Sequence, residues 1–312
     1  MNSPSSLPVV INLTDNNEMA GNETTNYKQG YSKSTLSSHA SRTVESDAAF
    51  LLPHIKPSDK ILDVGCGPGT ITGGLARHAP EGSVVGVDLS QSVLDDARRH
   101  LDELRGAAAA AADGNGGLGE VSFQVADVLA GLPFADGTFD VVYSSQLFPH
   151  LPPPDVPLRA MREMRRVLRP GGVLACRDVA EIHWYPRRLG LDRLHGRRLL
   201  RGVGAPDFPG PTMPALLRAA GFDVDGDGGG GAEGGGARIG AGTTVYSGPE
   251  GRRFLAEGLL GRLEEGDPYR RSWVEAGISE SEVEETRAAL REWVETEDAW
   301  YVAVQSEILA WK

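Results

Sequence analysis

The sequence has few cysteines and no long hydrophobic run. Its 312 residues include two cysteines, Cys66 and Cys176, which are too few for a disulfide framework. No apolar stretch approaches the roughly 20 residues that a transmembrane helix needs. The N-terminal residues also lack the basic segment and the continuous apolar segment of a secretion signal. These absences predict a cytoplasmic protein with reduced thiols and no membrane partner.

An excess of positive charge is also missing. The formal net charge is −12 at pH 7, so the chain as a whole would repel phosphate backbones and anionic lipid surfaces. The densest basic run recurs at helical spacing, which favours a solvated helix face over a nucleic-acid site. Its members are Arg159, Arg162, Arg165, Arg166 and Arg169. We therefore expect no nucleic-acid partner.

The composition is that of a globular protein, with 40% apolar and 24% charged residues. A chain of this length accommodates one sizeable α/β core with additions at its ends. The predicted division is a disordered tail at 1–26, an N-terminal helical cap at 27–56, a ligand-binding core at 57–246, a helical lid at 247–300 and a final strand of the core sheet at 301–312.

Strand-like and helix-like patterns alternate between residues 60 and 177. Strands are predicted at Lys60–Val64, Val84–Leu89, Val121–Val125, Phe139–Ser144 and Val173–Arg177, and helices at Thr70–His78, Ser92–Leu104 and Val156–Leu168. This alternation is typical of a doubly wound α/β fold, a parallel sheet with helices on both faces.

Several segments outside this alternation are also assigned. A first helix is predicted over Ala40–Ile55, from apolar residues three or four positions apart. Flexible loops are predicted at Gly106–Gly119 and Asp225–Gly242, which are of low complexity. The run Tyr301–Trp311 predicts a strand at the edge of the sheet.

A glycine-rich turn follows the first predicted strand. Residues Asp63–Thr70 read DVGCGPGT and lead from an apolar strand into a helix. Glycine lets the backbone approach a ligand closely, and free N–H groups at the start of a helix bind a polar or anionic group. A tight turn without a ligand would have the same pattern, so the loop alone does not decide between the two.

A carboxylate at the end of the second predicted strand favours a nucleoside-containing cofactor. Asp88 follows Gly65 by 23 residues, a spacing that suits hydrogen bonds to both ribose hydroxyls. The rival cofactor, NAD, has a fingerprint with a third glycine where this chain has Thr70. Asp63 would also repel a pyrophosphate, whereas it suits the ammonium of a methionine group.

Three more segments complete a family pattern: QVADV at Gln124–Val128, FDVVY at Phe139–Tyr143 and LRPGG at Leu168–Gly172. With the glycine loop and Asp88, they resemble the class I S-adenosylmethionine (SAM)-dependent methyltransferases over about residues 27–180. Within that class the chain is similar to the UbiE-like type of ubiquinone and menaquinone biosynthesis and its relatives that act on small molecules and secondary metabolites.

The resemblance implies SAM as the cofactor, no metal, and a Rossmann-like fold. The expected sheet is mostly parallel and seven-stranded with an antiparallel last strand, flanked by an N-terminal helical cap and a C-terminal helical lid. The implied contacts run from the methionine end through the ribose to the adenine. They are Asp63, Gly65, Cys66, Gly67 and Gly69, then Asp88 and Leu89, then Asp127 and Val128, with Gln146 closing over the site, Tyr31 in the cap and Arg42 as partner of the methionine carboxylate.

Methyl transfer from a sulfonium is an in-line displacement that needs no nucleophilic side chain, because alignment alone can contribute about 7–11 kcal/mol. A base is therefore optional, and histidine is the suitable type. His150, after the fourth strand, is the first candidate and His183, beyond the fifth, is the second. The alternatives are that His150 packs at a helix start and that His183 lies in a surface turn.

The leading hypothesis is a SAM-dependent methyltransferase with a small-molecule acceptor, a secondary metabolite. A quinone-biosynthesis C-methyltransferase and a SAM-binding regulator without transfer activity remain as alternatives. Members of the class that methylate nucleobase amines carry Asn/Asp-Pro-Pro-Tyr after the fourth strand, where this chain has Ser144–Leu147, SSQL. That difference also disfavours nucleic acid as the acceptor.

Overall fold

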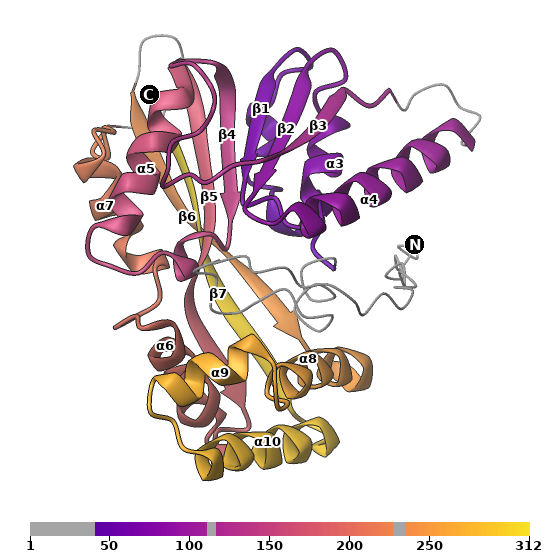
Figure 1. Cartoon of the computed structure of the whole chain (residues 1–312), viewed down its shortest axis with the longest axis vertical. Helices are drawn as coiled ribbons and strands as arrows, with labels where there is room; N and C mark the ends of the chain where they lie inside the picture. The colour runs from indigo at the N-terminus through magenta and orange to yellow at the C-terminus, as the bar shows by residue number, and fades with distance from the viewer. Residues whose placement is uncertain (1–40, 111–116, 227–234) are drawn as a thin grey trace.

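The computed structural model describes residues 41–110, 117–226 and 235–312. Its centre is a seven-stranded sheet in the order β3-β2-β1-β4-β5-β7-β6, with helices on both faces (Figure 1). Six strands run parallel, and β7 runs antiparallel to its neighbours β5 and β6. The strands are β1 Lys60–Val64, β2 Ser83–Asp88, β3 Glu120–Val125, β4 Phe139–Ser145, β5 Leu168–Tyr185, β6 Gly236–Tyr246 and β7 Trp300–Trp311. The predicted fold class is confirmed.

The helices fall into two groups, those on the sheet faces and those at one end of the molecule (Figure 1). The first group comprises α2 Val44–Asp47, α3 Thr70–Ala76, α4 Gln91–Ala110, α5 Val156–Val167 and α7 Met213–Ala219, and the second α6 Arg198–Val203, α8 Gly248–Arg262, α9 Pro268–Glu275 and α10 Glu280–Glu295. Short 3-10 turns are η1 Leu52–His54, η2 Phe148–His150, η3 Arg187–Leu189 and η5 Gly210–Thr212, and η4 Asp192–Arg197 is π-helical.

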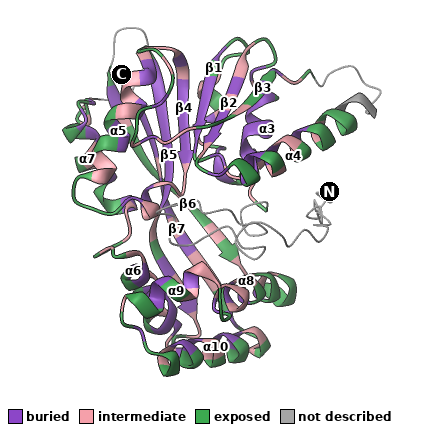
Figure 2. Ribbon diagram, viewed as in Figure 1, coloured by how far each residue is buried: buried purple, intermediate pink, exposed green. Residues whose placement is uncertain are grey.

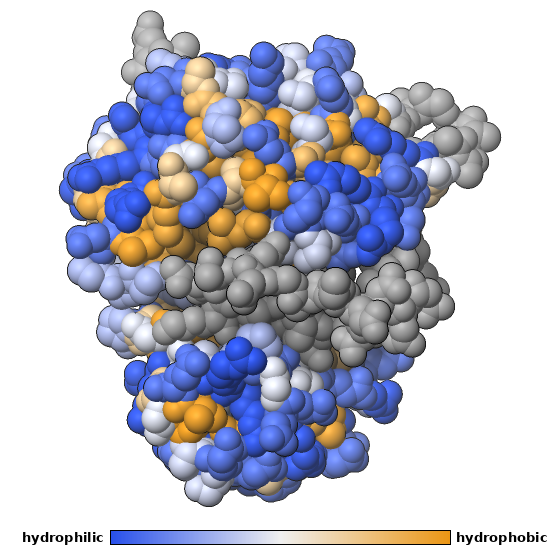
Figure 3. All heavy atoms as spheres, viewed as in Figure 1, coloured by the Kyte–Doolittle hydropathy of each residue, from blue (hydrophilic) through white to orange (hydrophobic). Residues whose placement is uncertain are grey.

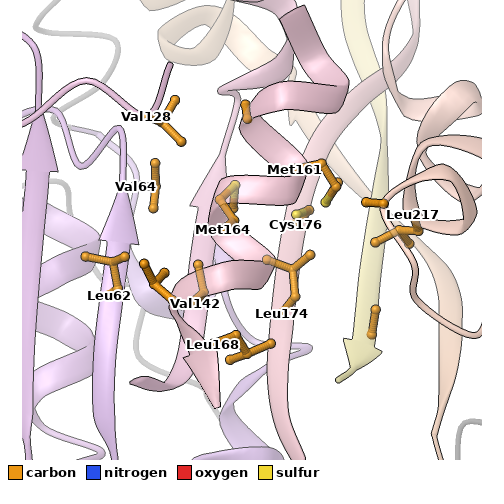
Figure 4. Close-up of a cluster of buried hydrophobic side chains, with 14 of the residues drawn as sticks. Leu62, Val64, Val128, Val142, Met161, Met164, Leu168, Leu174, Cys176 and Leu217 are labelled. Atoms are coloured by element: carbon orange, nitrogen blue, oxygen red, sulfur yellow. The ribbon is translucent and has the colours of Figure 1, made fainter. Parts of the chain in front are cut away.

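The central strands are buried on both sides, as expected for parallel strands covered by helices (Figure 2). On one face, Leu62, Val142 and Leu174 of β1, β4 and β5 pack against Met161 and Met164 of α5 (Figure 4). On the other face a second cluster joins α2 and α3 to the same strands. These two layers hold the carboxyl ends of the strands at one edge, where ligands bind in open α/β sheets.

Three strands continue past that edge. β4 ends at Ser145 opposite Arg177, but β5 runs on to Tyr185 while it pairs with β7, and β6 pairs with the other side of β7. This extension carries α6, α8, α9 and α10, which we call the helical lobe (Figure 1). On the face in Figure 3 the lobe is mainly hydrophilic, whereas apolar side chains gather on the sheet-bearing part.

The lobe has its own core around Trp184 of β5, which is fully buried. The Trp184 ring packs edge-on against Trp293 of α10 and Tyr301 of β7, with centroid distances of 4.9 and 4.7 Å. The Trp293 indole N–H also donates to the main-chain oxygen of Tyr185 at 2.8 Å. The lobe is therefore anchored to the strand extension through aromatic contacts.

The predicted first helix is wrong in its extent. Within the described residues, Ala40–Ile55 contains a four-residue helix, α2, and the 3-10 turn η1. A capping box between Thr43 and Ser46 starts α2, and Ala48 leaves the helical conformation, with φ −128°. Residues 1–26, the predicted tail, and 27–40 of the predicted cap lie outside the described residues.

Two predictions about the C-terminal half of the sheet were also wrong. The final strand is not at the edge: β7 lies between β5 and β6, and β6 is the outermost strand. The apolar residues of β7 suit an inner position, while the glycine-rich β6 is largely exposed. β6 begins at Gly236, inside the segment predicted as a loop, because pairing with β7 supplies main-chain partners that the composition did not reveal. Likewise α4 extends to Ala110, past the predicted Leu104.

None of the helices in the described ranges is both long enough and apolar enough to cross a lipid bilayer.

Candidate active site

A cavity of about 370 Å³ opens where β1, β2, β3 and β4 end, a volume within the usual range for small-molecule sites. Its wall contains most of the residues predicted to bind the cofactor. They are Arg42, Asp63, Gly65, Cys66, Gly67, Asp88, Leu89, Asp127, Val128 and Gln146. Gly69 is outside the wall, and Tyr31 lies outside the described residues. Segments far apart in the sequence therefore meet at one site.

The glycine loop is shaped by backbone conformations that favour glycine. Gly65, Gly67 and Gly69 have φ values of 75°, 54° and 74°, in the left-handed region. A Cβ on Gly67 would have no atom within 4 Å, whereas one on Gly69 would lie 2.8 Å from the Ala97 side chain and 2.9 Å from Phe123. Gly67 thus borders open space in the cavity, and Gly69 lets the loop pack on α4 and β3.

Asp88 is held at the end of β2 by two main-chain donors. The N–H of Gly67 donates to Oδ2 and the N–H of Ser90 donates to Oδ1, both at 3.1 Å. Each carboxylate oxygen can accept two hydrogen bonds, so both oxygens can also accept from the hydroxyls of a ligand. The arrangement fits the ribose role predicted for Asp88.

Asp63 is a buried carboxyl group, 2% exposed, that lines the cavity. Burial raises the pKa of Asp63 to about 7, and the charge of Asp88 adds to this, while a hydrogen bond from the Thr72 hydroxyl at 2.6 Å acts in the opposite direction. A bound cation would favour the ionised form. Burial, Asp63 and Asp88 together raise the pKa of the neighbouring Cys66 thiol, which therefore stays protonated.

The loop after β4 is fixed by unusual contacts. Gln146 has a φ of 55°, rare for a residue with a side chain. Its main-chain N–H donates to the oxygen of Arg177 at 2.8 Å, and its side-chain amide donates to Gln305 of β7 at 2.7 Å. Backbone strain of this kind is common at functional sites. The contacts hold Gln146 at the cavity wall.

Asp178 also holds the loop after β4 in place. It is fully buried, and its Oδ1 accepts the Phe148 N–H at 3.1 Å. Its Oδ2 is buried without a hydrogen-bond partner in the described part of the chain. Burial raises the pKa of Asp178 to about 7, opposed by main-chain hydrogen bonds and by the charges of Arg42 and Arg177. Asp178 directly follows the predicted fifth strand, Val173–Arg177, but no local pattern in the sequence indicates this supporting role.

Of the two predicted histidines, the structure brings only His150 to the cavity. His150 lies at the end of η2 and lines the wall. Burial, with smaller effects from the charges of Arg42 and Arg262, lowers the pKa of His150 to about 3. Its ring is therefore neutral near pH 7 and is a weak proton acceptor, because efficient general bases have a pKa near the working pH.

His183 lies away from the cavity wall in the described structure. Its Nε2 is 2.8 Å from a carboxylate oxygen of Glu181, and its Nδ1 is 3.2 Å from the guanidinium of Arg187. The expectation that His183 follows the end of strand five failed because β5 continues to Tyr185. The extra residues carry His183 toward the lobe, and they place Trp184 in the lobe core.

Comparison with known proteins agrees with this geometry. The methyltransferase domain family matches residues 61–172. The protein ltbC of Aspergillus luteorubrus, assigned by name as a methyltransferase, is 49% identical over 295 residues, which cover 93% of this chain and 98% of that protein. This chain belongs to the SAM-dependent methyltransferases. A demethylmenaquinone methyltransferase of Symbiobacterium thermophilum is 36% identical over 129 residues, covering 41% of this chain and 45% of that enzyme.

The fold of this methyltransferase also occurs in solved structures. A Bacillus halodurans protein solved as a candidate methyltransferase superposes with a TM-score of 0.50 at 17% identity, covering 85% of this chain and 98% of the other. At that identity the likeness concerns the fold alone. The predicted family, fold and cofactor, SAM, are confirmed.

A buried ionic network lies behind the methyltransferase's cavity. The Arg177 guanidinium is 2.8 Å from Asp47 of α2 and 3.1 Å from Glu307 of β7, and it donates to the Thr244 hydroxyl of β6 at 3.2 Å. The Tyr143 hydroxyl donates to the main-chain oxygen of Asp47 at 2.9 Å. The network joins the N-terminal segment, which carries Arg42, to four strands of the sheet, β4, β5, β6 and β7.

Proposed function

We propose that this methyltransferase transfers a methyl group from SAM to a small organic acceptor, a secondary metabolite, by in-line displacement. The observation that carries the proposal is the continuity of the cavity. It extends from the glycine loop and Asp88, past the loop after β4, to Val156 of α5 and Val203 of the lobe. One cavity thus offers a cofactor end and a second end where an acceptor can lie against the methyl group.

The proposed cofactor contacts follow the order of the strands. Asp63, buried beside the glycine loop, suits the methionine ammonium, and Gly67 offers main chain without a Cβ at the same place. Asp88 accepts the ribose hydroxyls, and Asp127 with Val128 faces the adenine after β3. Bound SAM supplies a methyl group on a positively charged sulfur. The chain's own contribution is alignment and exclusion of water, which can lower the barrier substantially.

The proposed role of residues 247–300 is to close the acceptor end. In the described lining no residue of that range is present, and the lobe contributes Val203 of α6. The support for a closing role is Arg262 at the end of α8, whose charge is near enough to lower the pKa of His150. We assign His150 to contact with the acceptor, as a neutral hydrogen-bonding group.

A quinone-biosynthesis C-methyltransferase is the second candidate, favoured by the similarity to the demethylmenaquinone enzyme. That similarity covers less than half of this chain, so it bears on the shared domain more than on the acceptor. Activity on a prenylated quinol would favour the second candidate over the first.

Calorimetry tests the cofactor site. We expect S-adenosylhomocysteine, the demethylated product, to bind and NAD to give no heat. Asp88→Asn should weaken binding about tenfold or more, because hydrogen bonds to a charged group contribute about 1.5–3 kcal/mol. Asp95→Asn is the matched control, since Asp95 is exposed on α4 and pairs with Arg98. Binding of NAD alone, or equal affinities for both variants, would contradict the assignment.

Transfer itself is tested by incubating the full chain with methyl-labelled SAM and a metabolite extract. Label in a small organic product supports the enzyme. A protein that binds SAM and transfers no label to any extract or prenylated quinol would instead be a SAM-binding regulator.

A further inference from the structure

The two ends of the cavity differ in charge. The lining carboxylates Asp63, Asp88 and Asp127 all belong to the cofactor end, after β1, β2 and β3. Beyond β4 the described lining contains no carboxylate. Most of that wall is apolar, formed by Leu147, Pro149, Leu151, Pro152, Val156 and Val203.

Positive charge is concentrated at the second end. Arg42 lines the cavity and forms no ion pair within the described part of the chain. Burial is the largest influence on the pKa of three nearby groups, since it lowers that of His150 and raises those of Asp178 and Tyr246; the charge of Arg42 is a smaller influence that favours neutral His150 and the ionised forms of Asp178 and Tyr246. Arg262 of α8 acts on His150 and Tyr246 in the same direction. Two guanidinium groups therefore act on the place where the acceptor is proposed to lie.

We propose that the acceptor carries an acidic hydroxyl, of the phenol or enol type, which binds as an oxyanion against Arg42 and His150 with its rings on the apolar wall. The proposal rests on the proposed function and names its substrate class. It assigns Arg42 to the acceptor, in place of the methionine carboxylate for which the sequence suggested it.

The chemistry of the end supports this class. An amine acceptor, protonated near neutrality, would be repelled by two guanidinium groups, whereas an oxyanion is stabilised by them. The hydroxyl proton leaves to solvent on binding, so no side chain has to hold it. The oxygen lone pair then forms the new O–CH3 bond while the S–CH3 bond breaks, and the bonding electrons return to sulfur. The products are a neutral methyl ether and a neutral thioether.

The test uses 4-nitrophenol as the probe, because its phenolate absorbs visible light and its phenol does not. The full chain, saturated with S-adenosylhomocysteine, is titrated with the probe at several pH values. We expect the pKa of the bound probe to fall by about one unit or more relative to the free probe, as for an acid beside a cation. The neutral analogue 4-nitroaniline should bind at least tenfold more weakly than the phenolate.

Variants connect the shift to Arg42. Arg42→Gln should abolish the pKa shift of the probe while the affinity for S-adenosylhomocysteine stays within threefold, and Arg42→Lys should keep part of the shift. Arg105→Gln, on the exposed end of α4 beside Asp102, should behave as the unchanged protein. Retained binding of S-adenosylhomocysteine also shows that each variant is folded.

Three results would overturn the proposal. The first is a bound probe with an unchanged or raised pKa, and the second is no binding of the phenolate at millimolar concentration. The third is an Arg42→Gln variant that keeps the probe shift but loses affinity for S-adenosylhomocysteine tenfold, which would return Arg42 to the methionine carboxylate. Failure of the unchanged protein to bind S-adenosylhomocysteine at all would instead contradict the proposed function, so the two failures are distinguishable.

Discussion

At the scale of single residues, burial changes the acid–base behaviour that the sequence alone would suggest for Asp63. The sequence placed a carboxylate where it would repel a pyrophosphate and suit an ammonium. The structure adds that the group is almost fully buried, with Asp88 nearby, so its pKa is raised to about 7. The free protein therefore protonates Asp63 within the physiological range, and a bound ammonium would keep it ionised.

The consequence is a pH-dependent cofactor affinity. Because binding favours the carboxylate, the affinity for S-adenosylhomocysteine should be highest above pH 7 and fall by up to about tenfold per pH unit below it. Calorimetry between pH 5.5 and 8 measures this fall, and two buffers with different ionisation enthalpies measure the proton released. In Asp63→Asn the affinity should be low and independent of pH.

The same shift makes a second, opposite contribution in the absence of cofactor. The folded pKa of Asp63 is above the ordinary value of about 4, so folding favours the protonated form. Its contribution to the free energy of unfolding is therefore largest at low pH and is lost as the pH rises from about 4 to about 7. The affinity for S-adenosylhomocysteine provides the control. If it depended on pH as strongly in Asp63→Asn as in the unchanged protein, another titrating group would be responsible, and Asp178 would be the first to examine because its pKa is also raised to about 7.

The two histidines show what single positions cannot reveal. Both follow apolar strands in the sequence, yet His150 lines the cavity and His183 does not. The difference is the length of β5, which depends on pairing with β7 more than a hundred residues later. The low pKa of His150 is equally invisible in the sequence, because it arises from burial and from charges on distant segments.

At the scale of elements, local patterns predicted the strands that carry the cofactor end. β1 has the predicted bounds, β3 and β4 differ from prediction by one residue at one end, and β2 is shifted by one residue at both ends. β1 and β4 are buried on both faces, so their apolar runs are strong signals. The first part of β6, up to Gly242, was predicted as a loop because its glycine-rich sequence has weak strand preference, and it is held by pairing with β7. The Ala40–Ile55 segment was overpredicted because apolar spacing continues where the helix ends at Ala48.

The glycine loop offers a matched pair of substitutions within one element. Gly67→Ala places a methyl group in open space, so the protein should fold with a cost of about 1–2 kcal/mol for the left-handed backbone. Its affinity for S-adenosylhomocysteine should fall at least tenfold, because the methyl group occupies the cofactor end. Gly69→Ala adds overlap with Ala97 and Phe123, which should cost about 1–3 kcal/mol more.

Urea denaturation and calorimetry on both variants check the pair. Gly69→Ala should be the less stable of the two variants. Gly67→Ala should lose more affinity for S-adenosylhomocysteine for each kcal/mol of stability that it loses. Equal affinity of Gly67→Ala and the unchanged protein would show that the loop does not approach the cofactor.

At the scale of the whole molecule, the site depends on segments that only the folded chain brings together. The cavity combines loops after four strands, the N-terminal segment and the lobe. Arg177 is the link, since it is 2% exposed and contacts α2, β6 and β7. No local pattern predicts such a network, because its partners are far apart in the sequence and each is an ordinary polar residue when taken alone.

The network predicts that one acidic residue of α2 is far more important than its neighbour. Asp47→Ala leaves the buried Arg177 with Glu307 as its one remaining carboxylate in the described structure. Removing one partner of a buried pair costs about 3–5 kcal/mol, and Glu307 should hold the loss near the lower value. Glu45→Ala, on the exposed side of the same helix, should change stability by less than about 0.5 kcal/mol.

Urea denaturation compares the two variants, and hydrogen exchange should show residues 41–55 less protected in Asp47→Ala alone. Because this segment carries Arg42, the variant should also lose the pKa shift of bound 4-nitrophenol while Asp88 still binds the ribose. Equal stability and equal exchange in the two variants would mean that the N-terminal segment is held to the sheet by its apolar contacts and not by Arg177.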